Sequence, residues 1–276
     1  MSWWDDALHR AVVEIVLAGA LAAIIGVQVV VRKLSFFTMA LTHATFPGVV
    51  AASLIGVNIF VGGLVAGAVV ALAVAALGRR PGQNSAAATG VVLSAGFALG
   101  AGLVATQDGF SRDLSSFLVG SILTVDTQDL IVTAVMLVVV SALLLVCARP
   151  FLYGGFDRSF SGRWDIVLML AIEAVVVTVV PAVGTILAVS LIVAPAAAAR
   201  LWSDRIPMIT GIAVGIGITG GLGGLWISYQ WNVAAGASIA LSVTILAAVA
   251  AALRRAIQVP TGPPSSRQVT TTAGLA

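Results

Sequence analysis

Long apolar stretches separated by short polar clusters make up most of the chain, and apolar and polar positions do not alternate within them. A membrane-spanning helix needs about 20 mostly apolar residues, whereas a strand of a membrane barrel needs about 10 alternating ones. The pattern therefore predicts an all-α polytopic membrane protein with about nine transmembrane helices. Their approximate bounds are 11–31, 34–56, 59–77, 86–106, 130–148, 166–183, 184–199, 206–228 and 233–253.

One apolar stretch, DLSSFLVGSILTV at 113–125, is too short to cross a bilayer comfortably, and we expect it to be a re-entrant segment or a half-helix. The basic residues favour the same arrangement. With the N-terminus outside and nine crossings, 12 of the 14 lysines and arginines fall inside, leaving Arg10 and Arg112 outside. If 113–125 crossed the membrane, most of the later basic residues would move outside.

This topology divides the chain into three parts. Residues 1–10 form an extracytoplasmic N-terminus, and 11–255 form the transmembrane domain. The tail 256–276 is rich in Pro, Ser and Thr, so we expect it to be a disordered cytoplasmic end.

Composition agrees with a membrane protein and excludes several activities. The chain is 60% hydrophobic and only 9% charged, whereas soluble domains carry roughly a quarter charged residues. A single cysteine excludes an internal disulfide. The one lysine, Lys33, is followed by Leu34, so the chain holds no GxxxxGK[ST] phosphate loop for ATP. No nucleophile, base and orienting group can be assembled from the polar residues, so we do not expect an enzyme.

Three ionisable side chains lie within the apolar stretches: Glu14, His43 and Glu173. Such a group costs about 2.5–3.5 kcal/mol at a helix centre, so it normally lines a cavity or finds a partner. Glu14 is close enough to the outer end of its helix to reach lipid headgroups. Glu173 is deeper, and it either lines a path or bonds to a neighbouring helix.

The stretch FFTMALTHATFPG, residues 36–48, contains the most specific pattern. Met39 and His43 are four residues apart and share one face of a helix. Pro47 removes a backbone hydrogen bond and bends or breaks the helix about one turn above, while Gly48 permits close backbone approach. An imidazole and a thioether facing a cavity suit a transition-metal ion. The alternative is a kinked core helix whose histidine bonds to a carbonyl, and the residues alone leave both open.

LTHATFPGVVAA, residues 41–52, resembles the second-helix signature D-x-x-x-H-A-x-x-P-G of the ABC-type zinc and manganese permeases. Similar blocks follow in that family's order, so that the resemblance covers about 11–255. They are FLVGSILTVDTQDL (117–130), GFDRSFSG (155–162), VGTILAVSLIVAPAAAARLW (183–202) and GLWISYQWNVAAGASIAL (224–241).

The resemblance implies the permease subunit of an ABC importer in the bacterial plasma membrane. Its transported substrate would be a divalent metal ion of the zinc, manganese or iron class, with no permanently bound cofactor. The implied partners are a separate cytoplasmic ATP-binding subunit and an external solute-binding protein. We expect two permease copies around one path, contact with membrane lipid and no nucleic-acid partner. The competing interpretations are a gradient-driven secondary transporter and a permease-like membrane anchor.

Within this interpretation, Met39, His43 and Glu173 are the candidate path residues, and Pro47 with Gly48 forms the helix kink. The inner loop 149–165 is the expected contact with the ATPase, through Phe156, Asp157 and Arg158. The alternative for this segment is an ordinary connecting loop.

Two residues depart from the family pattern, which has aspartate where this chain has Met39 and Asn232. Carboxylate oxygens suit manganese and a thioether does not. The departures favour a softer ion, a weaker transit site or a different substrate. A weak site agrees with transport, because a path must also release what it binds.

Overall fold

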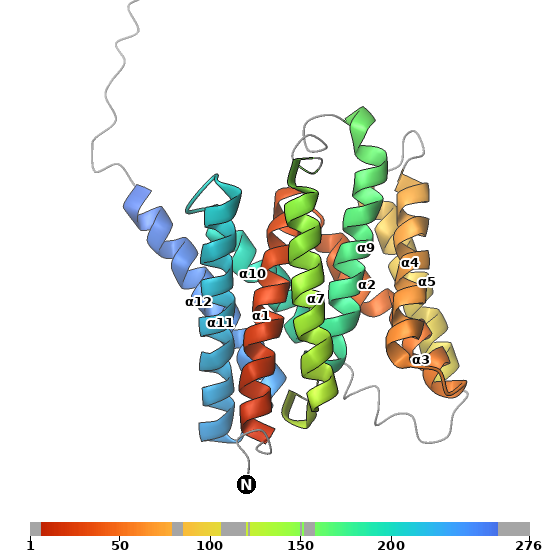
Figure 1. Ribbon diagram of the computed structural model, residues 1–276, viewed down its shortest axis with the longest axis horizontal. Helices are drawn as coiled ribbons and strands as arrows, with labels where there is room; N and C mark the ends of the chain where they lie inside the picture. Colours follow the sequence, from red (N-terminus) through yellow and green to blue (C-terminus); the bar gives the residue numbers. More distant parts are fainter. Residues whose placement is uncertain are drawn as a thin grey trace, which may run out of the picture.

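The computed structural model describes residues 7–78, 85–105, 120, 122–149, 151 and 158–258. Over these residues the regular elements are all helical (Figure 1). They are α1 (Ala7–Val31), α2 (Ser35–Ala44), α3 (Phe46–Leu54), α4 (Ile59–Gly78), α5 (Ser85–Ala105), the 3₁₀ turn η2 (Ile122–Thr124), α7 (Thr127–Val146), α9 (Arg158–Val183), α10 (Thr185–Arg200), α11 (Ile206–Trp231) and α12 (Ala235–Gln258).

Eight spans in the described residues are long and apolar enough to cross a membrane, with α2 and α3 together making one span. Helix α10 is a shorter apolar helix of 16 residues. The prediction of an all-α polytopic fold with about nine spans is therefore confirmed. In Figure 1 the start of α1 and the end of α12 lie at opposite ends of the bundle, as an odd number of crossings requires.

Helix α5 ends and helix α7 begins at the same end of the bundle, as we expect if the segment between them does not cross the membrane (Figure 1). Its described part is Gly120 and the residues from Ile122 onward, including η2. Arg10 of α1 donates a hydrogen bond from Nε to the carbonyl oxygen of Val125 at 3.0 Å. The described end of the short segment is thus attached to the first turn of α1, whereas residues 113–119 and 121, on which the expectation of a re-entrant element or half-helix depends, lie outside the described residues.

Several helices extend beyond the predicted apolar stretches. Helix α7 begins at Thr127, because Asp126 and Asp129 form a capping box in which each side chain accepts from the other's backbone N–H. Helix α9 begins at Arg158, inside the inner loop predicted at 149–165. Hydropathy marks only the part of a helix that suits lipid, whereas the helix continues through polar turns outside it.

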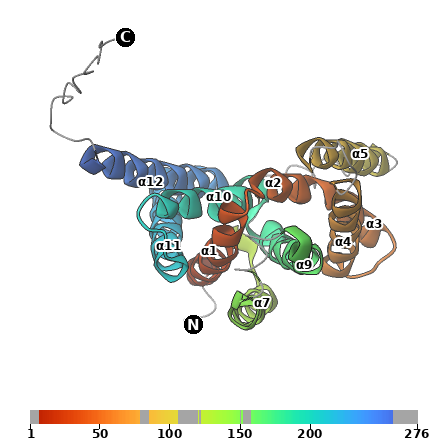
Figure 2. The ribbon, with the colours of Figure 1, turned by 90° about the horizontal axis from the view of Figure 1, so that it is seen from above.

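Seen from above, the helices form two groups with α9 between them (Figure 2). Helix α1 packs with α10 and α11, and α12 packs against α10 and α11. On the other side, α3, α4 and α5 pack together, and α4 also contacts α9. Helix α2 lies between the groups and contacts α5, α9 and α10. The largest fully buried side chains are mainly aliphatic and come from α1, α2, α9, α10, α11 and α12: Ile15, Leu21, Ile25, Leu41, Leu168, Ile172, Leu187, Leu191, Ile192, Ile209 and Ile239.

Small residues allow two of these contacts to be backbone against backbone. A Cβ added at Gly26 of α1 would overlap the carbonyl oxygen of Ile192 in α10. A Cβ added at Gly48 of α3 would overlap the carbonyl oxygen of Gly62 in α4. A Cβ added at Gly62 would likewise overlap the carbonyl oxygen of Gly48. Small-residue contacts of this kind let membrane helices gain dispersion energy where lipid supplies no hydrophobic driving force.

Candidate functional site

The span that carries the candidate ligands is interrupted at Thr45, which separates α2 from α3. Pro47 is the second residue of α3, and its ring nitrogen has no hydrogen to donate to the carbonyl of His43. The backbone N–H of Gly48 instead donates to the carbonyl of Thr45, three residues back, at 3.0 Å. A small apolar pocket lies beside this break, lined by Thr45, Val49, Ile59, Val177, Val180 and Pro181.

Met39 and His43 lie on an open face of α2. The exposed fractions are 44% for Phe36 and 43% for Met39, and His43 is half-buried. These residues follow one another at spacings of three and four, which places them on one side of the helix. The His43 ring meets Phe97 of α5 edge to face, with the ring centroids 6.4 Å apart.

The opposite side of α2 is closed. Thr38 and Thr42 are fully buried, and each hydroxyl donates to a nearby backbone carbonyl: that of Leu34, the N-cap residue of α2, at 3.1 Å and that of Met39 at 2.8 Å. These hydroxyls are satisfied within the helix, so they do not compete for a ligand. The polar and polarisable groups of α2 that can meet a solute are Met39 and His43.

Glu173 lies elsewhere, inside the contact between α9 and α4. It is fully buried, and neither carboxylate oxygen has a hydrogen-bond partner. A Cβ added at Gly67 of α4 would overlap this carboxylate, so Gly67 provides the space that Glu173 occupies. The structure therefore brings Met39 and His43 together on α2 and encloses Glu173 between two other helices.

Within the described residues, no group of three or more His, Cys, Asp and Glu side chains is placed to hold a metal ion. One chain thus offers one imidazole and one thioether on the open face of α2.

Glu14 does not reach outward as one sequence interpretation expected. It is fully buried on α1, and its Oε1 accepts a hydrogen bond from the Thr133 hydroxyl of α7 at 2.9 Å. Sequence reasoning missed Thr133. The signal was a hydroxyl inside a mostly apolar stretch, because a hydroxyl needs a partner when it is buried.

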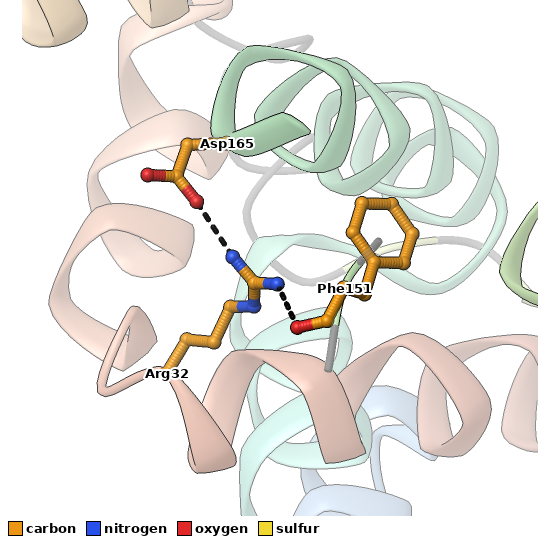
Figure 3. A network of polar contacts seen from close by, with 3 residues as sticks. All are labelled: Arg32, Phe151 and Asp165. Atoms are coloured by element: carbon orange, nitrogen blue, oxygen red, sulfur yellow. Dashed lines mark hydrogen bonds and ion pairs between the residues drawn. The ribbon is translucent and has the colours of Figure 1, made fainter. Parts of the chain in front are cut away.

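A second feature that sequence reasoning missed lies at the end of α1 (Figure 3). Arg32 donates from one guanidinium nitrogen to Asp165 Oδ1 at 2.6 Å and from the other to the carbonyl oxygen of Phe151 at 2.6 Å. The predicted topology placed Arg32 and Asp165 on the same side of the membrane, one directly after a helix and one directly before another. That coincidence could have indicated the pair.

The expected ATPase-contacting residues are only partly described. Phe156 and Asp157 lie outside the described residues, and Arg158 begins α9 with its side chain outside them. The residues on either side, Phe151 and Trp164, are described, and their rings meet edge to face at 6.2 Å. Asn232, the other departure from the family pattern, closes α11 in the left-handed conformation with φ of 51°. Asparagine tolerates that conformation better than most residues do.

Comparison with known proteins agrees with the resemblance drawn from the sequence. The model of the ABC 3 transport family matches residues 4–254. The manganese transport system membrane protein MntC of Halalkalibacterium halodurans is 31% identical over 250 residues, which cover 88% of this chain and 86% of the relative. The manganese import system permease protein ScaB of Streptococcus parasanguinis is 31% identical over 247 residues, covering 86% and 87%. A Haemophilus influenzae protein named "Probable iron transport system membrane protein" is 26% identical, covering 85% and 89%.

Two solved structures share the fold. PsaBC from Streptococcus pneumoniae, in complex with Fab, superposes with a TM-score of 0.79 at 28% identity and covers 88% of this chain and 90% of that chain. An inward-facing metal-chelate-type ABC transporter gives a TM-score of 0.66 at 15% identity, covering 90% and 84%, and supports the fold alone.

Proposed function

Because the chain belongs to the ABC 3 transport family, we propose that it is the transmembrane permease subunit of an importer for a divalent transition-metal ion of the manganese, iron or zinc class. The observation that carries the proposal is the family match over residues 4–254. The relatives named for manganese and iron transport support the substrate class. The open face of α2, with an imidazole and a thioether, supplies ligands of the type that a transition metal accepts.

The path that we propose passes Met39 and His43. One chain supplies two donors, and two copies related by a two-fold axis would supply four, a number that suits tetrahedral metal binding. The exposed Phe36 and Met39 on this face fit contact with a second copy across the path. Loss of the family's aspartate at Met39 weakens binding of a hard ion, so the site serves transient passage, and an external solute-binding protein supplies most of the selectivity.

We propose that Glu173 contributes to the path only in another conformation of the protein. Its carboxylate is enclosed by α4 and α9, so it reaches the path when these helices separate. A transporter needs such a change, because its bundle must open to one side at a time.

We assign the end of the bundle where α1 finishes to the cytoplasm. Arg32, Lys33, Arg200, Arg205, Arg254 and Arg255 flank helix ends there, as the positive-inside rule requires of a cytoplasmic face. The ATP-binding subunit docks at this end, on the 149–165 segment with Phe156, Asp157 and Arg158. The N-terminus lies outside, where the solute-binding protein delivers the ion, and the protein works in the plasma membrane of a bacterium.

The test begins with purification of the tagged chain in a mild detergent, identification of co-purifying proteins and reconstitution into liposomes. We expect a stoichiometric partner with a phosphate loop and ATP-dependent uptake of Mn²⁺, Fe²⁺ or Zn²⁺. His43→Ala should abolish most of the uptake. His9→Ala, at the other histidine of the chain, is the matched control and should leave uptake unchanged. Uptake that follows a proton or sodium gradient without an ATPase would contradict the proposal and favour a secondary transporter.

A further inference from the structure

The turn that joins α1 to α2 is short and held by backbone hydrogen bonds. The Leu34 N–H donates to the carbonyl of Val29 at 2.8 Å, and the Lys33 N–H donates to the carbonyl of Val30 at 3.2 Å. With Lys33 in the left-handed conformation, φ 60°, these bonds form a Schellman motif that ends α1. Helix α2 begins at Ser35, two residues after Lys33. Arg32 therefore sits at the start of a rigid connection to the helix that carries Met39 and His43.

The Arg32 guanidinium binds one residue that precedes residues 152–157 in the chain and one residue that follows them. On one side it donates to the carbonyl of Phe151 and lies over that ring, 5.3 Å from its centroid. On the other side it donates to Asp165, whose neighbour Trp164 packs edge to face on Phe151. Figure 3 shows the guanidinium between Asp165 and Phe151.

The burial of the Arg32 side chain distinguishes this contact from an ordinary surface ion pair. The Arg32 side chain is only 11% exposed, against 38% for that of Asp165, and the two hydrogen bonds of Arg32 are both 2.6 Å. Charge-assisted bonds from a planar fork are stronger and better oriented than those of a single ammonium group. By contrast, Arg200 and Asp204, also at a helix end, are 3.8 Å apart with side chains 43% and 96% exposed. Exposed pairs of that kind contribute little.

We propose that Arg32 is a positioning residue that carries displacement of Phe151 and Asp165, which flank the expected ATPase-contacting residues of the 149–165 segment, to α2 and so couples ATP hydrolysis to the metal path. This inference rests on the proposed function, in which the ATPase docks on that segment. A displacement of Phe151 and Asp165 moves the guanidinium, the Schellman turn transmits the displacement, and α2 moves with Met39 and His43. Coupling of this kind requires an element whose position both sites bias, and α2 is that element.

The experiment uses the permease reconstituted with its ATP-binding subunit in liposomes, with Mn²⁺ as the probe ion. Uptake and ATP hydrolysis are measured together, and the readout is the number of ions taken up per ATP. Arg32→Gln should lower this ratio at least about fivefold, the lower limit of typical allosteric coupling. Asp165→Asn should lower it less, because Arg32 keeps its bond to Phe151. Arg32→Lys should fail to restore it, since an ammonium cannot form the fork. Arg200→Gln is the matched control and should leave the ratio unchanged.

A second readout is independent of transport. In the complex without nucleotide, Arg32→Gln should speed amide hydrogen exchange in the first turns of α2, residues 35–41, and Arg200→Gln should not. An unchanged ratio of ions to ATP in Arg32→Gln would overturn the proposal. So would a parallel fall of uptake and hydrolysis caused by loss of the ATP-binding subunit, because Arg32 would then only support assembly. Absence of ATP-dependent uptake by the wild-type complex would instead overturn the proposed function itself.

Discussion

Gly120 offers a sharp test of the packing around the short segment between α5 and α7. Its φ is 76°, a left-handed conformation that costs a residue with a Cβ about 1–2 kcal/mol. A Cβ there would also overlap the carbonyl carbon and oxygen of Val183 and the nitrogen of Gly184. These are backbone atoms at the junction between α9 and α10, so no change of rotamer can relieve the overlap. Overpacking of a tight site typically costs about 1–3 kcal/mol.

We therefore expect Gly120→Ala to lower the free energy of unfolding by about 2–5 kcal/mol, the sum of the two penalties. Two other glycines separate these contributions. Gly56 has φ of 71° and nothing within 4 Å of an added Cβ, so Gly56→Ala reports the conformational penalty alone. Gly215 is inside α11 with open space around it, and Gly215→Ala should gain up to about 1 kcal/mol of helix propensity.

The measurement is reversible unfolding of the purified permease in mixed detergent micelles, with all variants compared under one set of conditions. The expected order of stability is Gly215→Ala, wild type, Gly56→Ala and then Gly120→Ala. If Gly120→Ala cost no more than Gly56→Ala, the close contact of the short segment with the α9–α10 junction would be refuted.

Three further predictions concern the path and the buried carboxylates. Met39→Asp restores the carboxylate of the family pattern, so manganese uptake should rise relative to zinc uptake in a competition assay; an unchanged ratio would contradict a ligand role for Met39. Thr133→Val removes the hydroxyl that donates to Glu14, and unfolding should become easier by about 1–3 kcal/mol. A variant as stable as the wild type would show that Glu14 does not depend on that bond. Gly67→Ala should destabilise the protein by displacing the Glu173 carboxylate, and Glu173→Ala in the same chain should relieve most of that effect. Additive effects in this double-mutant cycle would exclude the contact.

Hydropathy was sufficient to predict the spans, because lipid requires every crossing segment to be a long apolar helix with its own backbone bonds satisfied. The break in the second span was predictable from Pro47, since a missing N–H acts locally and needs no tertiary partner. That α5 ends and α7 begins at the same end of the bundle was predictable from the basic residues, because charge bias acts on each loop separately. The family followed from short blocks in a fixed order along the chain.

The same reasoning was unable to place the ionisable groups. Glu14 and Glu173 differ in sequence only in their depth within an apolar helix, yet one bonds to Thr133 and the other fills the space left by Gly67. In the sequence, Arg32 resembles any other basic residue expected on the cytoplasmic side. In the structure, its guanidinium donates hydrogen bonds to Phe151 and Asp165, more than a hundred residues away.

The sequence alone determined that about nine long apolar segments cross, where one of them breaks and which residues of α2 share a face, because these follow from forces within a segment or between a segment and lipid. Only the tertiary structure decided which side of α2 is open, which carboxylate has a partner and what the end of α1 holds. Those outcomes depend on which helices lie beside each other. Glu14 and Thr133 are 119 positions apart, and Arg32 and Asp165 are 133 positions apart. A hydrogen bond between residues so far apart produces no periodic pattern in the sequence of either segment.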